Sequence, residues 1–321
     1  MKKMFMLFVL SLSLILTSVS FADEWPNKNI NLYIGFGAGG TTDMSARLLA
    51  QLLEEDLGVK VVTENKPGGG GVVLASLMSA MKPDGYSLMT LSASPVSITP
   101  NRQKLTYDPF ADITLIAQYG IWNFAVAVPA NSPFNTLKEM IEFARANPGK
   151  VTFSTSGTGN TQHLVMEQIN TFEKIKMIAV PFKSGAEAAA AAMGGHVTCM
   201  VGVSEWIGPV KSGDMKLLAS MDEERMHDFP DVPTLLELGY DFYADTNFLG
   251  IAGPGGMPED IVKKIEASIQ KATKDQRFID LMSKLHFPIQ FKGHKDWTNV
   301  AHSANRRIKI VLEGLGLGIK D

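Results

Sequence analysis

Short apolar runs alternate with amphipathic stretches along most of this chain. A helix is predicted over residues 44–57 and ends at Gly58, because apolar side chains recur at helical spacing at Met44, Leu48, Leu52 and Leu53. The segments around it are predicted as strands at Asn31–Ile34, Val59–Thr63 and Tyr86–Leu91, with a second helix at Val72–Met81. Strands that alternate with helices in this way indicate an α/β fold with mainly parallel sheets.

The same alternation continues to the C-terminus. It predicts strands at Asn123–Val128, Val151–Ser154, Ile178–Phe182, Val197–Val201 and Phe248–Gly253. Helices are predicted at Thr136–Ala146, Thr161–Phe172, Ala186–Met193, Glu259–Lys274 and Val300–Glu313. We expect the chain to cross between two domains near Phe124 and near Phe248. The first domain would then contain residues 23–122 and 249–321, and the second residues 123–248.

Two glycine-rich loops each follow a predicted strand and precede a predicted helix. The first loop is Gly35–Asp43 (Gly-Phe-Gly-Ala-Gly-Gly-Thr-Thr-Asp), and the second loop is Ser154–His163 (Ser-Thr-Ser-Gly-Thr-Gly-Asn-Thr-Gln-His). Glycines let the backbone turn tightly, and free N–H groups with hydroxyls at a helix start form an uncharged site for an anion. Ser92 and Ser94 add hydroxyls at a third strand end, where open α/β sheets bind ligands. The sequence therefore predicts a ligand held from two sides.

The N-terminus has the pattern of an export signal. Lys2 and Lys3 precede an apolar stretch from Met4 to Val19, and Ser20-Phe-Ala22 forms a small-x-small cleavage site. A membrane anchor is the competing interpretation, but spanning a bilayer takes about 20 continuous apolar residues. We expect cleavage after Ala22 and a soluble exported protein.

Composition narrows the possible partners. The formal net charge is −3, and it becomes −5 without the two lysines of the leader, which argues against nucleic acid or an anionic membrane as partner. The one cysteine, Cys199, lies in an apolar run and is predicted to be a small core residue.

Each loop also matches a cofactor motif, and these matches define an alternative function. Gly35, Gly37 and Gly40 fit the dinucleotide fingerprint, with Glu64 near the place of the ribose-binding acid. The segment Ser156–Thr161 is similar to the phosphate loop of flavodoxins, although flavodoxins carry it on their first strand. An exported enzyme with a dinucleotide or flavin is therefore the alternative to a binding protein. We expect that the protein binds no cofactor.

Signs of catalysis are few. The six histidines show no metal-ligand spacing, and no Gly-x-Ser-x-Gly elbow accompanies His163 of the second loop. We therefore interpret His163 as a residue that shapes the site or caps its helix, rather than as a catalytic base. Asp43 is interpreted mainly as a partner of its own helix dipole. No catalytic residue and no metal ligand is predicted.

A series of short motifs runs in order along the whole mature chain. These motifs are Trp25-Pro-x-Lys28-x-Ile30, Gly39-Gly-Thr-Thr-Asp43, Glu64-Asn-Lys-Pro-Gly-Gly-Gly-Gly71, Lys82-Pro-Asp-Gly-Tyr86, Leu105-x-Tyr-Asp-Pro-Phe110, Ser156-Gly-Thr-Gly-x-Thr-Gln-His163, Gly185, Gly194-Gly-x-Val197, Lys211-x-Gly213, Phe229-Pro-x-Val-Pro-Thr234, Gly239 and Gly250-x-x-x-Pro254. Each motif is weak alone, but their order is specific. Together they resemble the TctC/Bug family of extracytoplasmic solute-binding proteins of tripartite tricarboxylate transporters.

The resemblance implies a type II-like periplasmic-binding-protein fold, with two lobes, a hinge and a cleft that holds a small mono-, di- or tricarboxylate. The implied partners are that ligand and the membrane subunits of a transporter, and the protein is expected to be a monomer. The ligand-binding residues implied by the two loops and the strand ends are Gly37, Ala38, Gly39, Gly40, Thr41, Thr42, Ser92, Ser94, Ser156, Gly157, Thr158, Gly159, Asn160, Thr161, Gln162, His163, Val203 and Ser204.

The chain departs from the family pattern at two places. The first loop begins Gly35-Phe-Gly-Ala where many members have Pro-Phe-x-Pro, and Gly202-Val-Ser204 stands where many have an Asp-Asn pair. The missing carboxylate favours a ligand without an ammonium group, and the sequence does not identify which carboxylate is bound.

Overall fold

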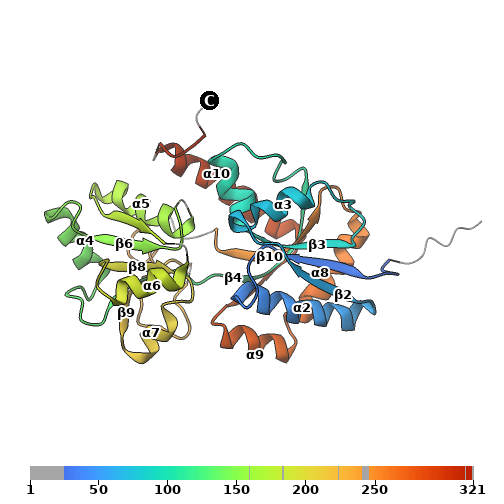
Figure 1. Cartoon of the computed structure of the whole chain (residues 1–321), viewed down its shortest axis with the longest axis horizontal. Helices are drawn as coiled ribbons and strands as arrows, with labels where there is room; N and C mark the ends of the chain where they lie inside the picture. Colours follow the sequence, from blue (N-terminus) through green and yellow to red (C-terminus); the bar gives the residue numbers. More distant parts are fainter. Residues whose placement is uncertain are drawn as a thin grey trace, which may run out of the picture.

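The computed structural model describes residues 25–158, 160–182, 184–222, 224–240, 246–314 and 316–319. The predicted leader and Gly159 lie outside these residues. The chain forms two lobes, each built on one sheet with helices on both faces (Figure 1). No helix in the described ranges is long and apolar enough to cross a membrane.

The large lobe contains the six-stranded sheet, with strand order β11-β4-β10-β3-β1-β2. Its first part comprises β1 (Ile30–Ile34), α2 (Thr41–Leu57), β2 (Val61–Asn65), η2 (Gly69–Gly71), α3 (Val72–Met78), β3 (Ser87–Ser92), η3 (Ser94–Ile98), η4 (Thr99–Asn101) and β4 (Ile113–Ile121). Its second part comprises β10 (Phe248–Pro254), α8 (Glu259–Ala272), α9 (Gln276–Lys284), β11 (Ile289–Lys292) and α10 (His294–Gly314).

The small lobe contains the five-stranded sheet, with strand order β7-β6-β8-β5-β9. Its elements are β5 (Ala125–Pro129), α4 (Leu137–Ala146), β6 (Thr152–Thr155), α5 (Thr161–Glu173), β7 (Ile178–Pro181), α6 (Gly185–Met193), β8 (Cys199–Gly202), α7 (Ile207–Ser212) and β9 (Met215–Ser220). Cys199 is fully buried on β8, as predicted, and burial raises the pKa of its thiol to about 12.

Both sheets are mixed, so the expectation of mainly parallel sheets was wrong in part. β1 pairs in parallel with β2 and β3, and β6 pairs in parallel with β7 and β8. The pairs of β10 with β3 and β4, of β11 with β4, and of β5 with β8 and β9 are antiparallel. Strands β4, β9 and β11 had not been predicted, and they take part in three of these five antiparallel pairs. Helices α7 and α9 had not been predicted either.

Helix boundaries follow local signals. Gly58, at φ 72°, ends α2, and Thr136 with Glu139 forms a capping box at the start of α4. The buried face of α2 agrees with the prediction at Leu52 and Leu53, but Met44 is 37% exposed and Leu48 is only partly buried. Leu49 lies in the core instead, and Ala46 and Ala50 complete this face.

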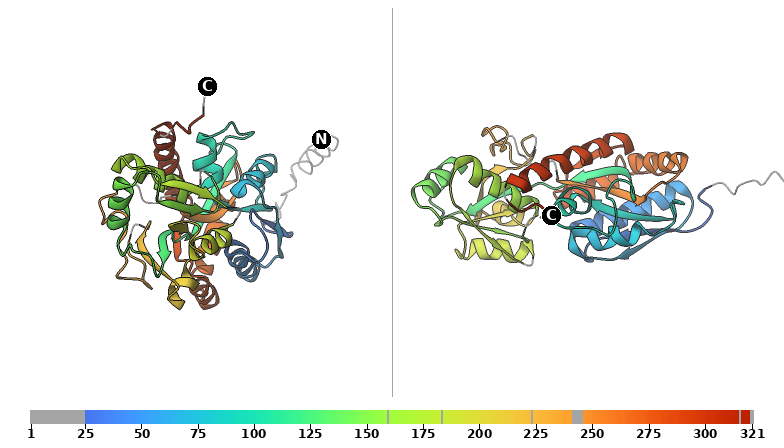
Figure 2. Two further views of the ribbon diagram at one scale, coloured as in Figure 1. Left: turned by 60° about the vertical axis from the view of Figure 1, so that its left-hand side comes forward. Right: turned by 90° about the horizontal axis from the view of Figure 1, so that it is seen from above.

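Each lobe has one apolar core on each face of its sheet. In the large lobe, α2, α8 and α9 cover one face, and α3 and α10 cover the other. Leu164 of α5 joins the second of these cores beside Phe248 and Trp297, so the small lobe is anchored to α10 by an apolar contact. Figure 2 (right panel) shows α10 lying along the large lobe with one end toward the small lobe.

Two segments that cross between the lobes lie side by side. The first joins β4 to β5 through Trp122 and Asn123, and the second enters β10 after Asn247. The Trp122 N–H donates to the Asn247 carbonyl at 2.8 Å, and Ile121 pairs with Phe248 where β4 and β10 adjoin these segments. Paired extended strands of this kind are suited to act as a hinge.

Candidate functional site

The first loop joins the carboxyl end of β1 to the start of α2, and its glycines are exposed except for Gly35. Residues 37–40 are open to solvent, and Gly39 takes the left-handed conformation, at φ 79°. Gly40 is the N-cap of α2, and no side chain caps this helix end among the described residues. The positive dipole end of a 17-residue helix therefore lies next to the exposed residues 37–40, whereas in its first turn Thr41 is partly exposed and Thr42 and Asp43 are buried.

Asp43 stabilises the conformation of the first loop. Its carboxylate accepts hydrogen bonds from the Gly39 N–H at 2.9 Å, from Arg47 Nε at 2.9 Å and from Asn65 Nδ2 at 2.7 Å. Burial would raise the pKa of Asp43, but these hydrogen bonds outweigh it and hold the pKa below its usual value. The Gly39 N–H is thus already used within the loop.

The residues next to this loop do not form the arrangement of a dinucleotide site. Glu64 is exposed and pairs with Lys66 at 2.6 Å. Asn65 is the β2 residue that contacts the first loop, since its amide also donates to the Phe36 carbonyl at 3.0 Å. The acid expected to bind a ribose is therefore engaged elsewhere.

The hydroxyls at the end of β3 are also engaged within the large lobe. Ser92 Oγ donates to the Gly70 carbonyl at 3.0 Å, and Ser94 Oγ is 3.0 Å from Thr99 Oγ1. A side chain at Gly70 would approach Ser94 Oγ to 3.1 Å, so glycine is required for this close packing. The two serines connect the turn before α3 to the strand end.

The second loop joins the carboxyl end of β6 to α5. Asn160 caps α5, because its Oδ1 accepts the His163 N–H at 3.0 Å. The amides of Asn160 and Gln162 both lie 3.4 Å from Ser156 Oγ. Ser156 and Gly157 are partly exposed, and Thr158 is exposed.

Several predicted residues lie below the surface. Thr42, Thr161 and Gln162 are buried, and the Thr161 hydroxyl is 3.0 Å from that of Thr246. His163 is 3.6 Å from Glu167 on the same helix and packs near Phe153. Hydrogen bonding by His163 lowers the pKa of Glu167 despite partial burial. These contacts place His163 within the small lobe, and its role at the site stays a prediction.

Arg102 is a candidate site residue that the sequence analysis missed. It follows η4 in the large lobe, and its Nη1 donates to the Thr158 carbonyl of the second loop at 3.2 Å. A cation thus bridges the segment after β3 to the second loop. In the sequence, this arginine stands in a polar stretch without any recognisable motif, so only the fold reveals its position.

Glu205 is the second residue that was missed. Its Oε2 accepts the Val203 N–H at 3.0 Å, directly after β8. A side chain at Gly185 would collide with the Glu205 carboxylate, so Glu205 lies against the start of α6. The small lobe therefore has a carboxylate next to the predicted residues Val203 and Ser204. It lies close to the segment that the sequence analysis interpreted as lacking the Asp-Asn pair.

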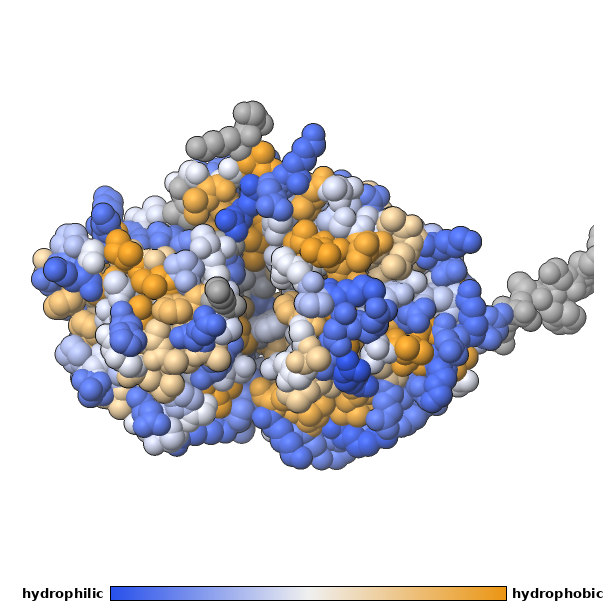
Figure 3. Space-filling model, viewed as in Figure 1, coloured by the Kyte–Doolittle hydropathy of each residue, from blue (hydrophilic) through white to orange (hydrophobic). Residues whose placement is uncertain are grey.

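The predicted residues that are exposed lie toward the junction of the lobes. Figure 3 shows a groove between the two lobes on the face that is turned to the viewer. Across the junction, Arg102 reaches the second loop, and the Phe36 ring of the first loop lies 5.9 Å from the ring of Trp122, in the crossing segment. Neutral donors dominate this arrangement, with Arg102 as an added cation, so it is suited to bind an organic anion.

Comparison with known proteins agrees with this geometry. Residues 45–317 match the family described as the tripartite tricarboxylate transporter family receptor, TctC. The chain is 35% identical over 296 residues to the "UPF0065 protein in gbd 5'region" of Cupriavidus necator, covering 92% of this chain and 90% of that one.

Solved structures share the two-lobed fold. A TctC solute-binding protein from Polaromonas is 26% identical with a TM-score of 0.80, covering 90% of this chain and 99% of its own. Two more distant proteins share the fold. One from R. palustris, solved with adipate, is 24% identical with a TM-score of 0.78, covering 91% of this chain and 99% of its own. MatC from Rhodopseudomonas palustris, solved with bound malate, is 23% identical with a TM-score of 0.75, covering 90% of this chain and 100% of its own. The family match spans both lobes and both crossing segments, and together with the shared fold it shows that this chain belongs to the TctC family of tripartite tricarboxylate transporter receptors.

Proposed function

We propose that this protein captures a small carboxylate in the groove between its lobes and delivers it to the membrane subunits of a tripartite tricarboxylate transporter. Membership of the TctC family supports the role in transport. The adipate and malate of the two distant structures belong to those proteins, and they illustrate the ligand size that this fold accommodates. We propose a mono-, di- or tricarboxylate ligand of similar size.

The uncapped start of α2 is the observation that carries this proposal. Residues 37–40 are exposed at the positive end of a 17-residue helix, and Thr41 follows with a hydroxyl. A carboxylate placed there receives N–H and O–H donors without an ion pair. Ser156, Gly157 and Thr158 face it from the small lobe in this proposal, with Gly159, which lies outside the described residues.

Arg102 and Glu205 then act on opposite parts of the ligand. Arg102 lies at the second loop and adds positive charge for a second carboxylate. Glu205 is an acceptor beside Val203 and Ser204, so it suits a hydroxyl or other donor group on the ligand. This acceptor weakens the expectation that the ligand lacks an ammonium group, which had depended on the absence of a carboxylate after β8.

The remaining features of the proposal follow the family role. The protein is a periplasmic monomer without catalytic activity or cofactor, and its leader is cleaved after Ala22. Residues 23–122 with 249–321, and residues 123–248, act as two bodies around the crossing segments.

A thermal-shift screen of the mature chain against a library of small carboxylates tests this function. A ligand that binds only the native state raises its stability by about 2.7 kcal/mol at a hundredfold excess over Kd. We expect at least one carboxylate to do so, and NADH, NADP⁺ and FMN to have no effect. Stabilisation by a nucleotide or flavin alone, together with a cofactor absorbance, would instead support the enzyme alternative.

A further inference from the structure

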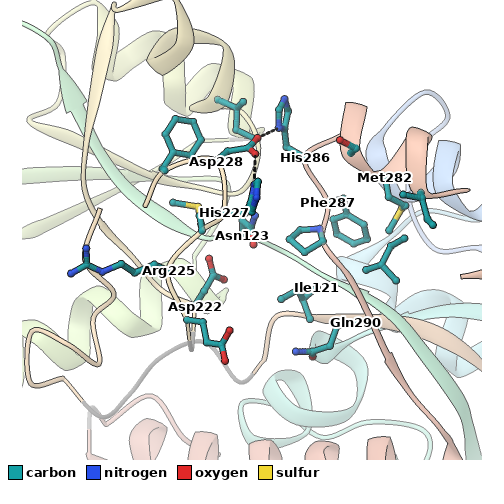
Figure 4. A pocket seen from close by; sticks show the side chains of 18 of the residues that line it. Ile121, Asn123, Asp222, Arg225, His227, Asp228, Met282, His286, Phe287 and Gln290 are labelled. Carbon is teal, nitrogen blue, oxygen red and sulfur yellow. Dashed lines mark hydrogen bonds and ion pairs between the residues drawn. The ribbon is translucent and has the colours of Figure 1, made fainter. Parts of the chain in front are cut away.

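A second cavity lies between the lobes, away from the two loops. Its volume is about 590 Å³, and none of the residues that line it belongs to either loop. Its walls come from the segment after β9, from the start of α7, and from the α9–β11 region of the large lobe (Figure 4). In the sheet orders, β9 and β11 are edge strands. Strands β5 and β8 separate β9 from β6, which carries the second loop, and β4, β10 and β3 separate β11 from β1, which carries the first loop. The cavity therefore lies on the opposite flank of the crossing segments from the groove.

Two buried polar groups in the cavity wall have no hydrogen-bond partner among the described residues. Asp222 is 5% exposed and neither of its carboxylate oxygens is paired. Trp206 is 1% exposed and its indole Nε1 is unpaired as well. Asn247 is near enough to affect the pKa of Asp222, but it is not in hydrogen-bond geometry with either oxygen. Buried groups left in this state are costly, and a bound cation would compensate the Asp222 carboxylate, whereas the Trp206 N–H would need an acceptor.

The charges around the cavity leave negative charge in excess. Arg225 is held by both carboxylate oxygens of Glu237 and by the Pro230 carbonyl. Lys211 is 3.8 Å from Asp228, and His286 of the large lobe bridges these two residues at 3.1 and 3.2 Å. The positive groups thus already have partners, whereas no cation pairs with Asp222 among the described residues.

Apolar and aromatic side chains form the rest of the wall. Phe229 packs edge-on against Trp206, with ring centroids 5.4 Å apart, and Phe287 with Met282 faces them from the large lobe. Aromatic faces next to a carboxylate form a favourable environment for an organic cation.

We propose that this cavity is a second ligand site, which takes a small organic ammonium ion with an apolar body. The Asp222 carboxylate is the counter-ion for the ammonium group. Trp206, Phe229 and Phe287 contact the apolar body.

The ionisation of Asp222 makes this binding dependent on pH. Burial raises the pKa of Asp222 to about 8, so the carboxyl group is mainly neutral at pH 7 and mainly charged at pH 9. A cation binds the charged form, so affinity rises with pH through this range. Glu224, Arg225, His227, Asp228 and Lys211 from the small lobe and His286 from the large lobe also face this region. The Asp222→Asn variant separates their effect from that of Asp222.

The test uses the mature chain and benzyltrimethylammonium chloride, whose charge does not change with pH. Binding is measured by calorimetry and by the NMR signals of the indole N–H groups at pH 6.5 and pH 9, with benzyl alcohol as the uncharged probe. We expect a shift of the Trp206 indole signal, assigned with Trp206→Phe, and at least tenfold tighter binding at pH 9. Benzyl alcohol should bind weakly and without this dependence on pH.

Matched variants decide the role of Asp222. Asp222→Asn should weaken cation binding at pH 9 at least tenfold and remove its rise between pH 6.5 and 9, whereas Asp231→Asn, an exposed carboxylate outside the cavity wall, should leave both unchanged.

Ile279→Trp fills the cavity from the large lobe and should block binding with Asp222 intact. Thr158→Val should have no effect on the cation, which separates this site from the groove. Equal binding by wild type and Asp222→Asn, or no binding at millimolar cation, would overturn the proposal.

Discussion

The threonines of the predicted site differ in their exposure to solvent, and this difference decides which of them is accessible to a ligand. Thr158 is exposed beside Gly157, and its carbonyl is held by Arg102. Thr42 is buried under the first loop, and its carbonyl accepts from Ser45. Thr158 is therefore the better position for testing ligand binding.

Replacing Thr158 by valine keeps the side-chain shape but removes a hydroxyl donor. A hydrogen bond to a charged group contributes roughly 1.5–3 kcal/mol, so affinity for the carboxylate should fall about ten- to a hundredfold. Thermal stability should change little, because the side chain is exposed. Thr171→Val, at an exposed position on α5, is the control and should bind normally in calorimetry. Unchanged affinity in Thr158→Val would remove this hydroxyl from the site.

Asp222 predicts an unusual dependence of stability on pH. Its pKa is about 8 in the folded protein and near the ordinary value of 3.8 when unfolded, so the folded state binds the proton more tightly. The stability contribution of this group is thus fully present below pH 4 and is lost as the pH rises to about 8, at ~1.4 kcal/mol per unit of pKa shift.

The Asp222→Asn variant has no ionisable group at this position. We expect its gain in unfolding free energy over wild type to grow between pH 4.5 and pH 8 in urea denaturation, to a few kcal/mol. Asp231→Asn, which is exposed, should show no such trend. A constant difference between Asp222→Asn and wild type across this range would mean that Asp222 is ionised in the folded protein.

At the scale of elements, the N-cap residue that would best stabilise the start of α2 differs from the one that would best leave it open to an anion. Gly40 has φ −79°, which any residue can adopt, and a side chain there would meet only the Gly37 carbonyl, at 3.6 Å. Serine or aspartate at the N-cap stabilises a helix start better than glycine does. Glycine at this exposed position leaves the start of α2 without a side-chain cap. An uncapped start leaves the N–H groups free for an anion.

Gly40→Asp should therefore separate the two properties. The new carboxylate caps α2, so stability should stay equal or rise by a few tenths of a kcal/mol. It also repels a bound carboxylate, and affinity should fall about a hundredfold. Gly40→Ala adds the same Cβ without the charge and should bind within about threefold of wild type, as measured by calorimetry beside a thermal melt. If both variants lost affinity equally, the cause would be steric, and the helix-dipole argument would be wrong.

At the scale of the whole molecule, the paired crossing segments allow the lobes to move against each other. Trp122 lies at their centre, with its ring 5.9 Å from that of Phe36 and 5.6 Å from that of Phe287. It therefore touches the first loop on one side and the wall of the second cavity on the other. Rotation about this segment would change the groove and the cavity together.

Binding of the carboxylate should shift the population toward a closed form, because a ligand that touches both lobes makes more contacts there. Small-angle scattering should show a smaller radius of gyration with the ligand than without it. Thr158→Val at the same ligand concentration should show less compaction, in proportion to its lower occupancy. An unchanged radius at saturation would mean that the ligand contacts one lobe only.

The amino-acid sequence alone was sufficient to predict the order of most elements, the two loops and the family. These features depend on local signals, such as alternation of apolar residues, glycine at a helix end and a motif read in order. The helix at Thr161–Glu173 and the strand at Ile30–Ile34 were predicted within one residue for this reason. By contrast, β4 was missed because Ile113–Ile121 is mostly apolar, with polar residues only at Thr114 and Gln118, and shows no strict alternation. Helix α9 was missed although Phe278 and Met282 mark its buried face.

Only the tertiary structure decided which side chains from distant segments meet. Arg102 reaches the second loop because the chain turns back after β3, and Glu205 reaches Gly185 because α6 and β8 are neighbours. The direction of the strands was decided in the same way, since the chain crosses between the lobes twice and β10 returns antiparallel between β3 and β4. Asp222 is a plain acidic residue in the sequence, and its burial follows from the packing of two lobes around it. Local chemistry is encoded along the chain, whereas the meeting of remote residues depends on how the sheets and lobes pack.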